Sequence, residues 1–156
     1  MNKFFKTVLL TGLFVGTTDI LYAYVSIFIQ RGKFSEKMFT YIAAGALGIK
    51  TALAGGVWAA FLGMFFHYFI AFAYTLFFFW IFPKIKFLSF NKYLVGMLYA
   101  IFVNLTMGQI ILRLTALPPP GPFNVSETFV DWIIFGIVFG IPIAWNAYKY
   151  YGVKAE

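Results

Sequence analysis

The residues that could carry chemistry are few, and they lie inside long apolar segments. Asp19 lies near the middle of the apolar stretch 6–29, and His67, the only histidine, lies in the stretch 56–82. An ionisable side chain within a bilayer is costly, so it is expected to face protein or water and to serve a function. If Asp19 and His67 pair, the carboxylate would orient the imidazole and the two could relay protons. The alternative is a hydrogen bond that only fixes how two helices pack.

Four further polar side chains are candidates for intramembrane roles. Asn104 and Gln109 are expected to hydrogen-bond between helices. Arg113 is expected to extend to the lipid headgroups, with an anion site as the alternative. Lys50 either reaches water at the interface or extends to Asp19.

Several kinds of chemistry are disfavoured by what the chain lacks. It has no cysteine, one histidine and five acidic residues. A protein-ligated metal centre is therefore not expected, and neither is any other cofactor. The sequence contains none of the common phosphate-binding, zinc-protease or serine-nucleophile motifs. These observations predict a protein without enzymatic activity.

The elements that must hold these residues are membrane-spanning helices. Hydrophobic residues make up 62% of the 156 positions and charged residues only 11%, with 22 phenylalanines. The mean hydropathy is +0.86, and a soluble domain carries roughly twice as many charged residues. A span needs about 20 apolar residues. The chain is therefore expected to be a single all-α membrane domain, with spans at about 6–29, 56–82, 93–117 and 127–148.

The segment before the second span is harder to assign. From Met38 to Phe82 the chain is apolar apart from Lys50 and His67, about twice the length of one crossing. A hinge is expected at Gly55-Gly56. Residues 38–54 then form a short re-entrant or interfacial helix. If that segment crosses fully, the chain has five spans.

Lysines indicate which side of the membrane holds the termini. With four spans, one side collects Lys3, Lys6, Lys84, Lys86, Lys92, Lys149 and Lys154. The loop 117–127 on the other side has no basic residue, although Arg31, Lys33 and Lys37 also fall there. The excess of lysine predicts cytoplasmic termini.

Each predicted span has a face of small residues, as helix–helix contacts in membranes require. The glycines expected at such contacts are Gly12, Gly16, Gly55, Gly63, Gly96, Gly108, Gly136 and Gly140. Asp19 and His67 lie on two of these faces, which points both side chains toward other helices rather than toward lipid.

Several motifs follow one another between about residues 64 and 135. They are Phe82-Pro83-Lys84-Ile85-Lys86, the next apolar span, Leu117-Pro118-Pro119 and Asn124-Val125-Ser126-Glu127, the last resembling a capped helix start. Together they resemble the YagU-type family of bacterial inner-membrane proteins. The resemblance implies a bacterial inner-membrane location and a similar arrangement of helices, and it carries over no catalytic residue. Where that family tends to have histidine after N-V-S-E, this chain has Asp131.

Two functional hypotheses follow. The first is a small non-enzymatic subunit that packs through its small-residue faces in a homo-oligomer or a larger membrane complex. The second is an oligomeric transporter or channel for protons or a small ion that uses Asp19 and His67 at the midplane. Either protein has the lipid bilayer and other membrane subunits as partners, and neither binds nucleic acid.

Overall fold

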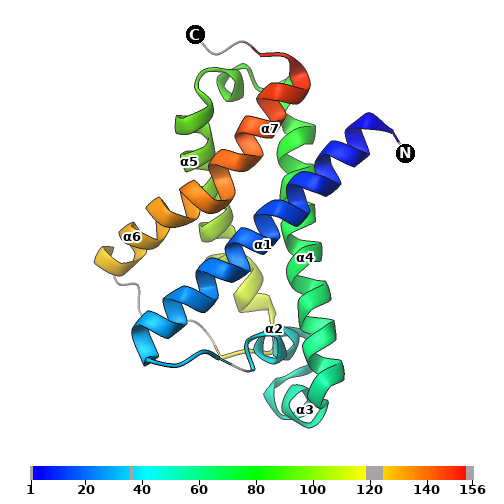
Figure 1. The fold of residues 1–156 in the computed structure, drawn as a ribbon, viewed down its shortest axis with the longest axis vertical. Coiled ribbons are helices and arrows are strands. Elements are labelled where there is room, and N and C mark those ends of the chain that lie inside the picture. Colours follow the sequence, from blue (N-terminus) through cyan, green and yellow to red (C-terminus); the bar gives the residue numbers. More distant parts are fainter. Residues whose placement is uncertain (1, 36, 119–124, 154–156) are drawn as a thin grey trace.

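The chain folds into a helical bundle, seen in a computed structural model that describes residues 2–35, 37–118 and 125–153 (Figure 1). No strand occurs in these ranges. The α-helices are α1 (Lys3–Arg31), α2 (Met38–Leu47), α3 (Ile49–Ala54), α4 (Gly56–Ile81), α5 (Lys92–Thr106), α6 (Val125–Phe135) and α7 (Ile141–Tyr151). Short helical turns are η1 (Phe82–Lys84), η2 (Lys86–Ser89), η3 (Met107–Ile111), η4 (Leu112–Leu114) and η5 (Gly136–Gly140).

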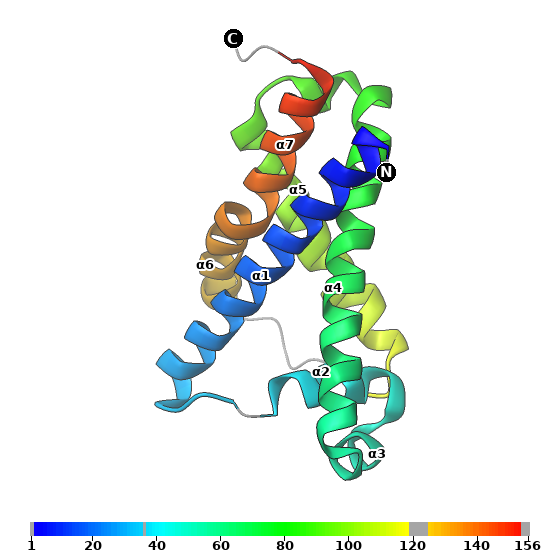
Figure 2. The same cartoon turned by 45° about the vertical axis from the view of Figure 1, so that its right-hand side comes forward.

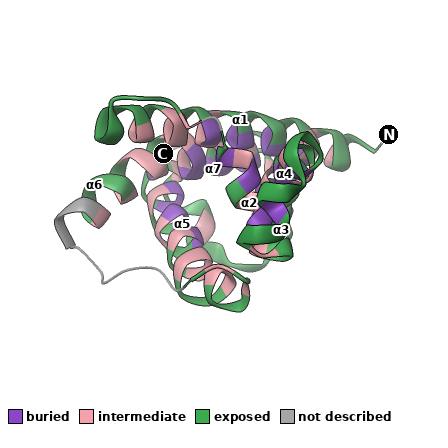
Figure 3. Ribbon diagram, turned by 90° about the horizontal axis from the view of Figure 1, so that it is seen from below, coloured by how far each residue is buried: buried purple, intermediate pink, exposed green. Residues whose placement is uncertain are grey.

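Four of the described helical segments are long and apolar enough to cross a membrane. They are Lys3–Arg31, Gly56–Lys84, Lys92–Leu114 and Thr128–Tyr151, with mean hydropathies of 1.5 to 1.8. Only 28 to 33% of the most apolar part of each is buried inside the bundle. Many of the exposed side chains are phenylalanines, leucines and tryptophans. Figure 3 shows exposed residues on the outer sides of the helices and buried ones where the helices meet. A surface this apolar suits lipid rather than water, so the chain is a multi-pass helical membrane protein.

Local signals explain where the long helices begin and end. Asn2 and Asn91 cap α1 and α5, with the Asn91 Oδ1 accepting from the amides of Tyr93 and Leu94 at 2.9 and 3.1 Å. Gly32 ends α1 with a φ of 68°, and Pro83 follows the end of α4. The motif Leu117-Pro118-Pro119 is described only as far as Pro118, and the side chains of Asn124-Val125-Ser126-Glu127 lie outside the described part of the chain.

Residues 38–54 form two short helices instead of the single helix that was expected. Gly48, with a φ of 78°, separates α2 from α3, and the chain turns again at Gly55 and Gly56 before α4. With 10 and 6 residues, α2 and α3 are about 15 and 9 Å long. Both lie at the end of the bundle opposite the termini (Figures 1 and 2).

The third and fourth long helices are not uniform α-helices, which the sequence pattern did not indicate. Each contains one π-helical turn, η3 after α5 and η5 between α6 and α7. The third segment ends at Leu114, three residues before the predicted Leu117. Single π-turns often occur at functional positions in helices, and η3 and η5 follow the parts of α5 and α6 that flank the site described below.

The buried core lies where α1, α4, α5 and α7 meet, toward the end that carries the termini. Its largest fully buried side chains include Phe78, Phe79, Ile143 and Val15. A smaller cluster of Ala43, Ala44, Ala52 and Ala59 joins α2 and α3 to α4.

Glycines on α1 and α4 allow close approach to neighbouring helices. A Cβ on Gly16 would lie 2.9 Å from Cδ1 of Tyr68, and a Cβ on Gly12 would lie 3.2 Å from Cα of Phe72. A Cβ on Gly63 would overlap the carbonyl of Phe39 in α2. The glycines of α1 therefore face α4, whereas Gly63 faces α2.

A second glycine contact joins α5 to the fourth long helix. A Cβ on Gly96 would lie 2.6 Å from Cα of Ile141, and one on Gly140 would overlap the Gly96 carbonyl. Gly136 likewise leaves room for the Met97 side chain. These small-residue faces are thus occupied within one protomer.

Two of the predicted packing glycines have other surroundings. Gly108 has no atom of another segment within 4 Å of where its Cβ would lie. The three atoms nearest to a Cβ on Gly55 belong to Thr51, Ala52 and Ala59, its own sequence neighbours, because Gly55 forms the turn between α3 and α4. Neither residue makes the helix–helix contact that its spacing suggested.

Candidate functional site

Asp19 lines an open, mostly apolar cavity between α1, α5 and α6, in which a few polar side chains converge. The cavity has a volume of about 360 Å³. Its polar lining consists of Asp19, Tyr22 and Ser26 from α1, Asn104 from α5, and Asp131 from α6. Two carboxylates from different helices therefore face one cavity within the apolar part of the molecule.

Two cross-helix hydrogen bonds hold α6 against this cavity. The Tyr22 hydroxyl donates to Oδ1 of Asp131 at 2.5 Å, joining α1 to α6. The indole Nε1 of Trp132 donates to Oδ1 of Asn104 at 3.0 Å, joining α5 to α6. Since Asp131 and Trp132 are adjacent, one turn of α6 is held from both sides. Asn104 is thus an interhelical partner.

His67 lies on α4 beside the same part of α1, but its direct partner is not Asp19. The imidazole Nε2 lies 2.7 Å from the carbonyl oxygen of Gly16. A carbonyl only accepts, so Nε2 carries the hydrogen. The Asp19 carboxylate interacts with His67 electrostatically, yet no ion pair or hydrogen bond joins the two in the described structure.

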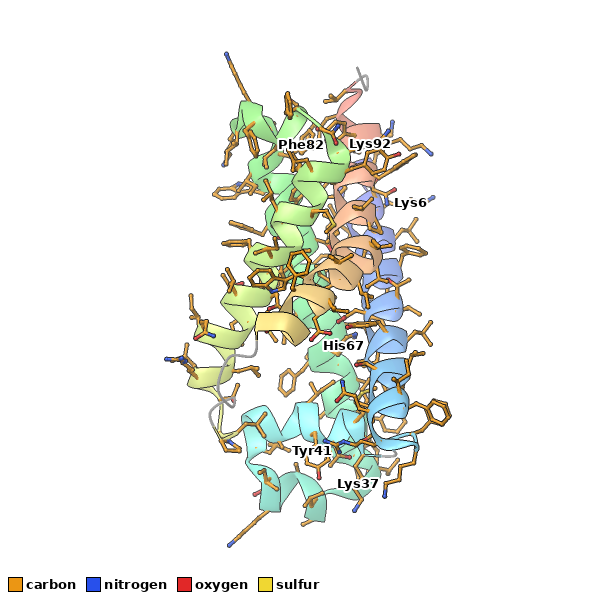
Figure 4. All side chains as sticks on the ribbon, turned by 90° about the vertical axis from the view of Figure 1, so that its left-hand side faces the viewer. Lys6, Lys37, Tyr41, His67, Phe82 and Lys92 are labelled. Atoms are coloured by element: carbon orange, nitrogen blue, oxygen red, sulfur yellow. The ribbon has the colours of Figure 1, made fainter. Side chains whose placement is uncertain are left out.

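A second hydrogen bond strengthens the α1–α4 contact at His67. The hydroxyls of Thr17 and Tyr68 lie 3.0 Å apart, one residue beyond Gly16 and His67 on their helices. In Figure 4, His67 lies at about the height where α6 begins, well inside the bundle. His67 therefore sets the packing of α1 on α4 close to the residue that lines the cavity.

The other candidate residues lie elsewhere. Lys50 is exposed on α3 and has no contact with Asp19. Arg113 donates from Nη2 to Oε1 of Gln109 at 2.7 Å, and both side chains are exposed. The Gln109 carbonyl oxygen is thus bonded one turn along its own segment, and Gln109 makes no hydrogen bond to another helix among the described residues.

Sequence reasoning missed Tyr22, Ser26 and Asp131 as site residues. A signal existed for the first two, because residues 19, 22 and 26 share one helix face. Asp131 offered the same signal as Asp19, a carboxylate inside a predicted span, but its meeting with Tyr22 depends on how two helices distant in sequence are aligned.

Within the described ranges, no group of three or more histidine and acidic side chains converges as a metal site requires. The cavity can instead accept hydrogen-bond donors, since Asp19 and Asp131 contribute carboxylate oxygens. A proton, a hydrated cation or an ammonium group fits that chemistry.

No protein-family model, curated protein or solved structure matches this chain.

Proposed function

We propose that this chain is a non-enzymatic protein of the bacterial cytoplasmic membrane that moves protons or a small cation through the cavity lined by Asp19 and Asp131. The observation that carries the proposal is the placement of two carboxylates from different helices at one cavity between apolar helices. Carboxylates in such positions commonly mark proton or ion pathways.

The location and orientation rest on charge and on sequence resemblance. Lys6 and Lys92 lie at the end that carries both termini, opposite Lys37 and Tyr41 (Figure 4). Lysine excess favours the cytoplasmic side, so we place the termini there, with α2 and α3 interfacial on the far side and four spans. The likeness to YagU-type proteins supports the same membrane.

His67 has a smaller part in this proposal than its position suggested. Its Nε2 is bonded to a backbone carbonyl, so the imidazole holds α1 against α4. Asp131 takes its place as the second titratable group, since it lines the same cavity as Asp19.

Flux through liposomes tests the proposal. The purified full chain is reconstituted in vesicles, and proton, Na⁺ and K⁺ movements are followed with an internal dye under an imposed potential. We expect flux above that of protein-free vesicles. Asp19→Asn and Asp131→Asn should each lower it at least tenfold, because each removes a titratable oxygen at nearly constant shape.

The matched control is Lys50→Gln, which also removes one charge but lies outside the cavity. It should leave flux unchanged. A wild-type protein that moves none of the three ions would overturn the proposal, as would full activity in both aspartate variants.

A second candidate is a subunit of a homo-oligomer or a larger complex, and one observation favours it. A groove beside the cavity is lined by Tyr22, Ser26, Gln30 and Asp131 and by apolar residues of α1 and α6, and Asp131 is exposed there. An exposed carboxylate facing lipid is costly, so another chain would cover it. Mild-detergent purification followed by mass measurement tests this: a monomer without co-purifying protein would argue against the subunit.

A further inference from the structure

The first turns of α1 and the last turns of α7 flank a groove that the proposed ion path does not use. Both helix ends lie at the same end of the molecule (Figures 1 and 2). The groove has a volume of about 540 Å³. It is lined by Lys3, Thr7, Leu10, Thr11 and Phe14 from α1, and by Asn146, Lys149 and Tyr150 from α7.

The lining changes from cationic to polar to apolar along α1. Lys3 begins the helix, Thr7 and Thr11 follow one and two turns later, and Phe14 lies about 16 Å from Lys3 along the axis. On α7, Lys149 and Tyr150 lie near the helix end and Asn146 one turn deeper. Leu10 and Phe14 are 56% and 55% exposed. A phospholipid has the same order of chemistry: phosphate, ester groups and acyl chain.

Thr11 is the most informative residue of the groove. Thr11 as a whole is only 3% exposed, and its hydroxyl makes no hydrogen bond to any residue that the structure describes. By contrast, Thr7, Thr17 and Thr75 each donate to a carbonyl of their own helix. The Thr11 hydroxyl can therefore donate to a group that enters the groove, which Thr11 lines.

The other polar side chains of the groove also have groups that can bind a ligand. The Asn146 amide donates to the Pro142 carbonyl at 2.9 Å, which leaves its side-chain oxygen and second amide hydrogen. Lys3 and Lys149 form no ion pair with a described residue. No acidic side chain among the described residues lines the groove, so the described lining carries a net positive charge.

We infer that this groove binds one anionic phospholipid. The phosphate lies between the ammonium groups of Lys3 and Lys149, the ester oxygens accept from Thr11 and neighbouring donors, and an acyl chain follows Leu10 and Phe14. Two ammonium groups favour a net negative headgroup over a zwitterionic one. The apolar part of the groove, at Leu10 and Phe14, favours a lipid over free phosphate.

Native mass spectrometry of the delipidated full chain in detergent tests the inference. Three probes are added: palmitoyl-oleoyl phosphatidylglycerol, the phosphatidylcholine with the same chains, and glycerol 3-phosphate. We expect one molecule of phosphatidylglycerol per chain, at least tenfold weaker retention of phosphatidylcholine, and no retention of glycerol 3-phosphate.

Two sets of variants assign the binding to this groove. The double variant Lys3→Gln with Lys149→Gln should weaken phosphatidylglycerol binding roughly 10- to 30-fold. This is the loss expected when two basic residues are removed, each with the usual contribution of a lysine near a membrane surface. The control, Lys84→Gln with Lys86→Gln, removes the same charge at exposed positions outside the groove and should change binding less than twofold. Thr11→Val should weaken binding several-fold, and Thr11→Ser should retain it.

Several outcomes would overturn the inference. Equal retention of the two lipids would show an apolar contact without headgroup recognition, and equal retention of glycerol 3-phosphate would show a free-anion site. If the control double variant loses as much affinity as the groove variant, the attraction is a diffuse property of the lysine-rich end. Circular dichroism of each variant checks that its helices are intact.

Discussion

Two prolines show how single residues link these helices. Pro142 has no amide hydrogen to donate to the carbonyl of Val138, four residues earlier, and the Thr18 hydroxyl of α1 donates to that carbonyl at 2.8 Å. Pro83 bears the same relation to Phe79, whose carbonyl accepts from the Tyr151 hydroxyl at 2.8 Å. In each case a side chain from another helix supplies the donor that proline lacks. The backbone defect thereby becomes a specific interhelical bond.

This pairing predicts a measurable coupling between Thr18 and Pro142. Thr18→Val removes the donor at nearly constant shape and should lower the free energy of unfolding in detergent by about 1 kcal/mol. In a Pro142→Ala background the restored amide can bond to Val138, so the same substitution should cost less. A double-mutant cycle measured by denaturant unfolding gives the difference.

The control for that cycle is Thr7→Val, because the Thr7 hydroxyl donates only within α1, to the Lys3 carbonyl. Its cost should not depend on residue 142. Equal costs for Thr18→Val in the two backgrounds would contradict the proposed role of proline.

At the scale of helices, glycine spacing alone does not identify a contact. Gly96 and Gly108 both recur on a four-residue spacing in one predicted span. A Cβ on Gly96 would meet the backbone of Ile141 at 2.6 Å, whereas one on Gly108 would meet nothing within 4 Å. The partner helix, not the spacing, decides which glycine is needed.

The two glycines therefore predict opposite responses to alanine. Gly96→Ala should destabilise the bundle by roughly 1–3 kcal/mol, because backbone atoms of Gly140 and Ile141 cannot move aside cheaply. Gly108→Ala should be neutral or stabilise by up to about 1 kcal/mol, since alanine favours helix and the space is open. Thermal unfolding in detergent compares the two, and equal losses would contradict the observed α5–α7 contact.

Apolar length and local signals predicted the long helices, whereas the arrangement of their side chains needed the tertiary structure. Asp19 was identifiable because a carboxylate stands out in an apolar segment, and Pro83 and Gly55-Gly56 are strong local breaks. The break at Gly48 was missed because a lone glycine in an apolar run does not reveal its positive φ. Asp131 was missed because its contact with Tyr22 depends on the alignment of α6 against α1, more than 100 residues apart in the chain.

For the molecule as a whole, the two ends differ in which elements they present. One end carries the termini, α7 and the turns η1 and η2, and the other carries α2 and α3 (Figure 1). Lys6, Lys86 and Lys149 are exposed at the first end, and Lys33 and Lys50 are exposed near the second. If the four apolar segments all cross the bilayer, each set is accessible from one side only.

Cysteine labelling tests this arrangement without background, because the chain has no native cysteine. Single replacements Lys6→Cys, Lys86→Cys and Lys149→Cys should react with a membrane-impermeant maleimide only in inverted vesicles, as cytoplasmic sites do. Lys33→Cys and Lys50→Cys should react only in intact cells.

Labelling Lys6→Cys and Lys86→Cys from opposite sides would mean that residues 38–54 cross the bilayer. Such a crossing would have to be made by two helices of about 15 and 9 Å, against a hydrocarbon core about 30 Å thick. Because that length is insufficient without stretching the turn at Gly48, we expect Lys6 and Lys86 on the same side.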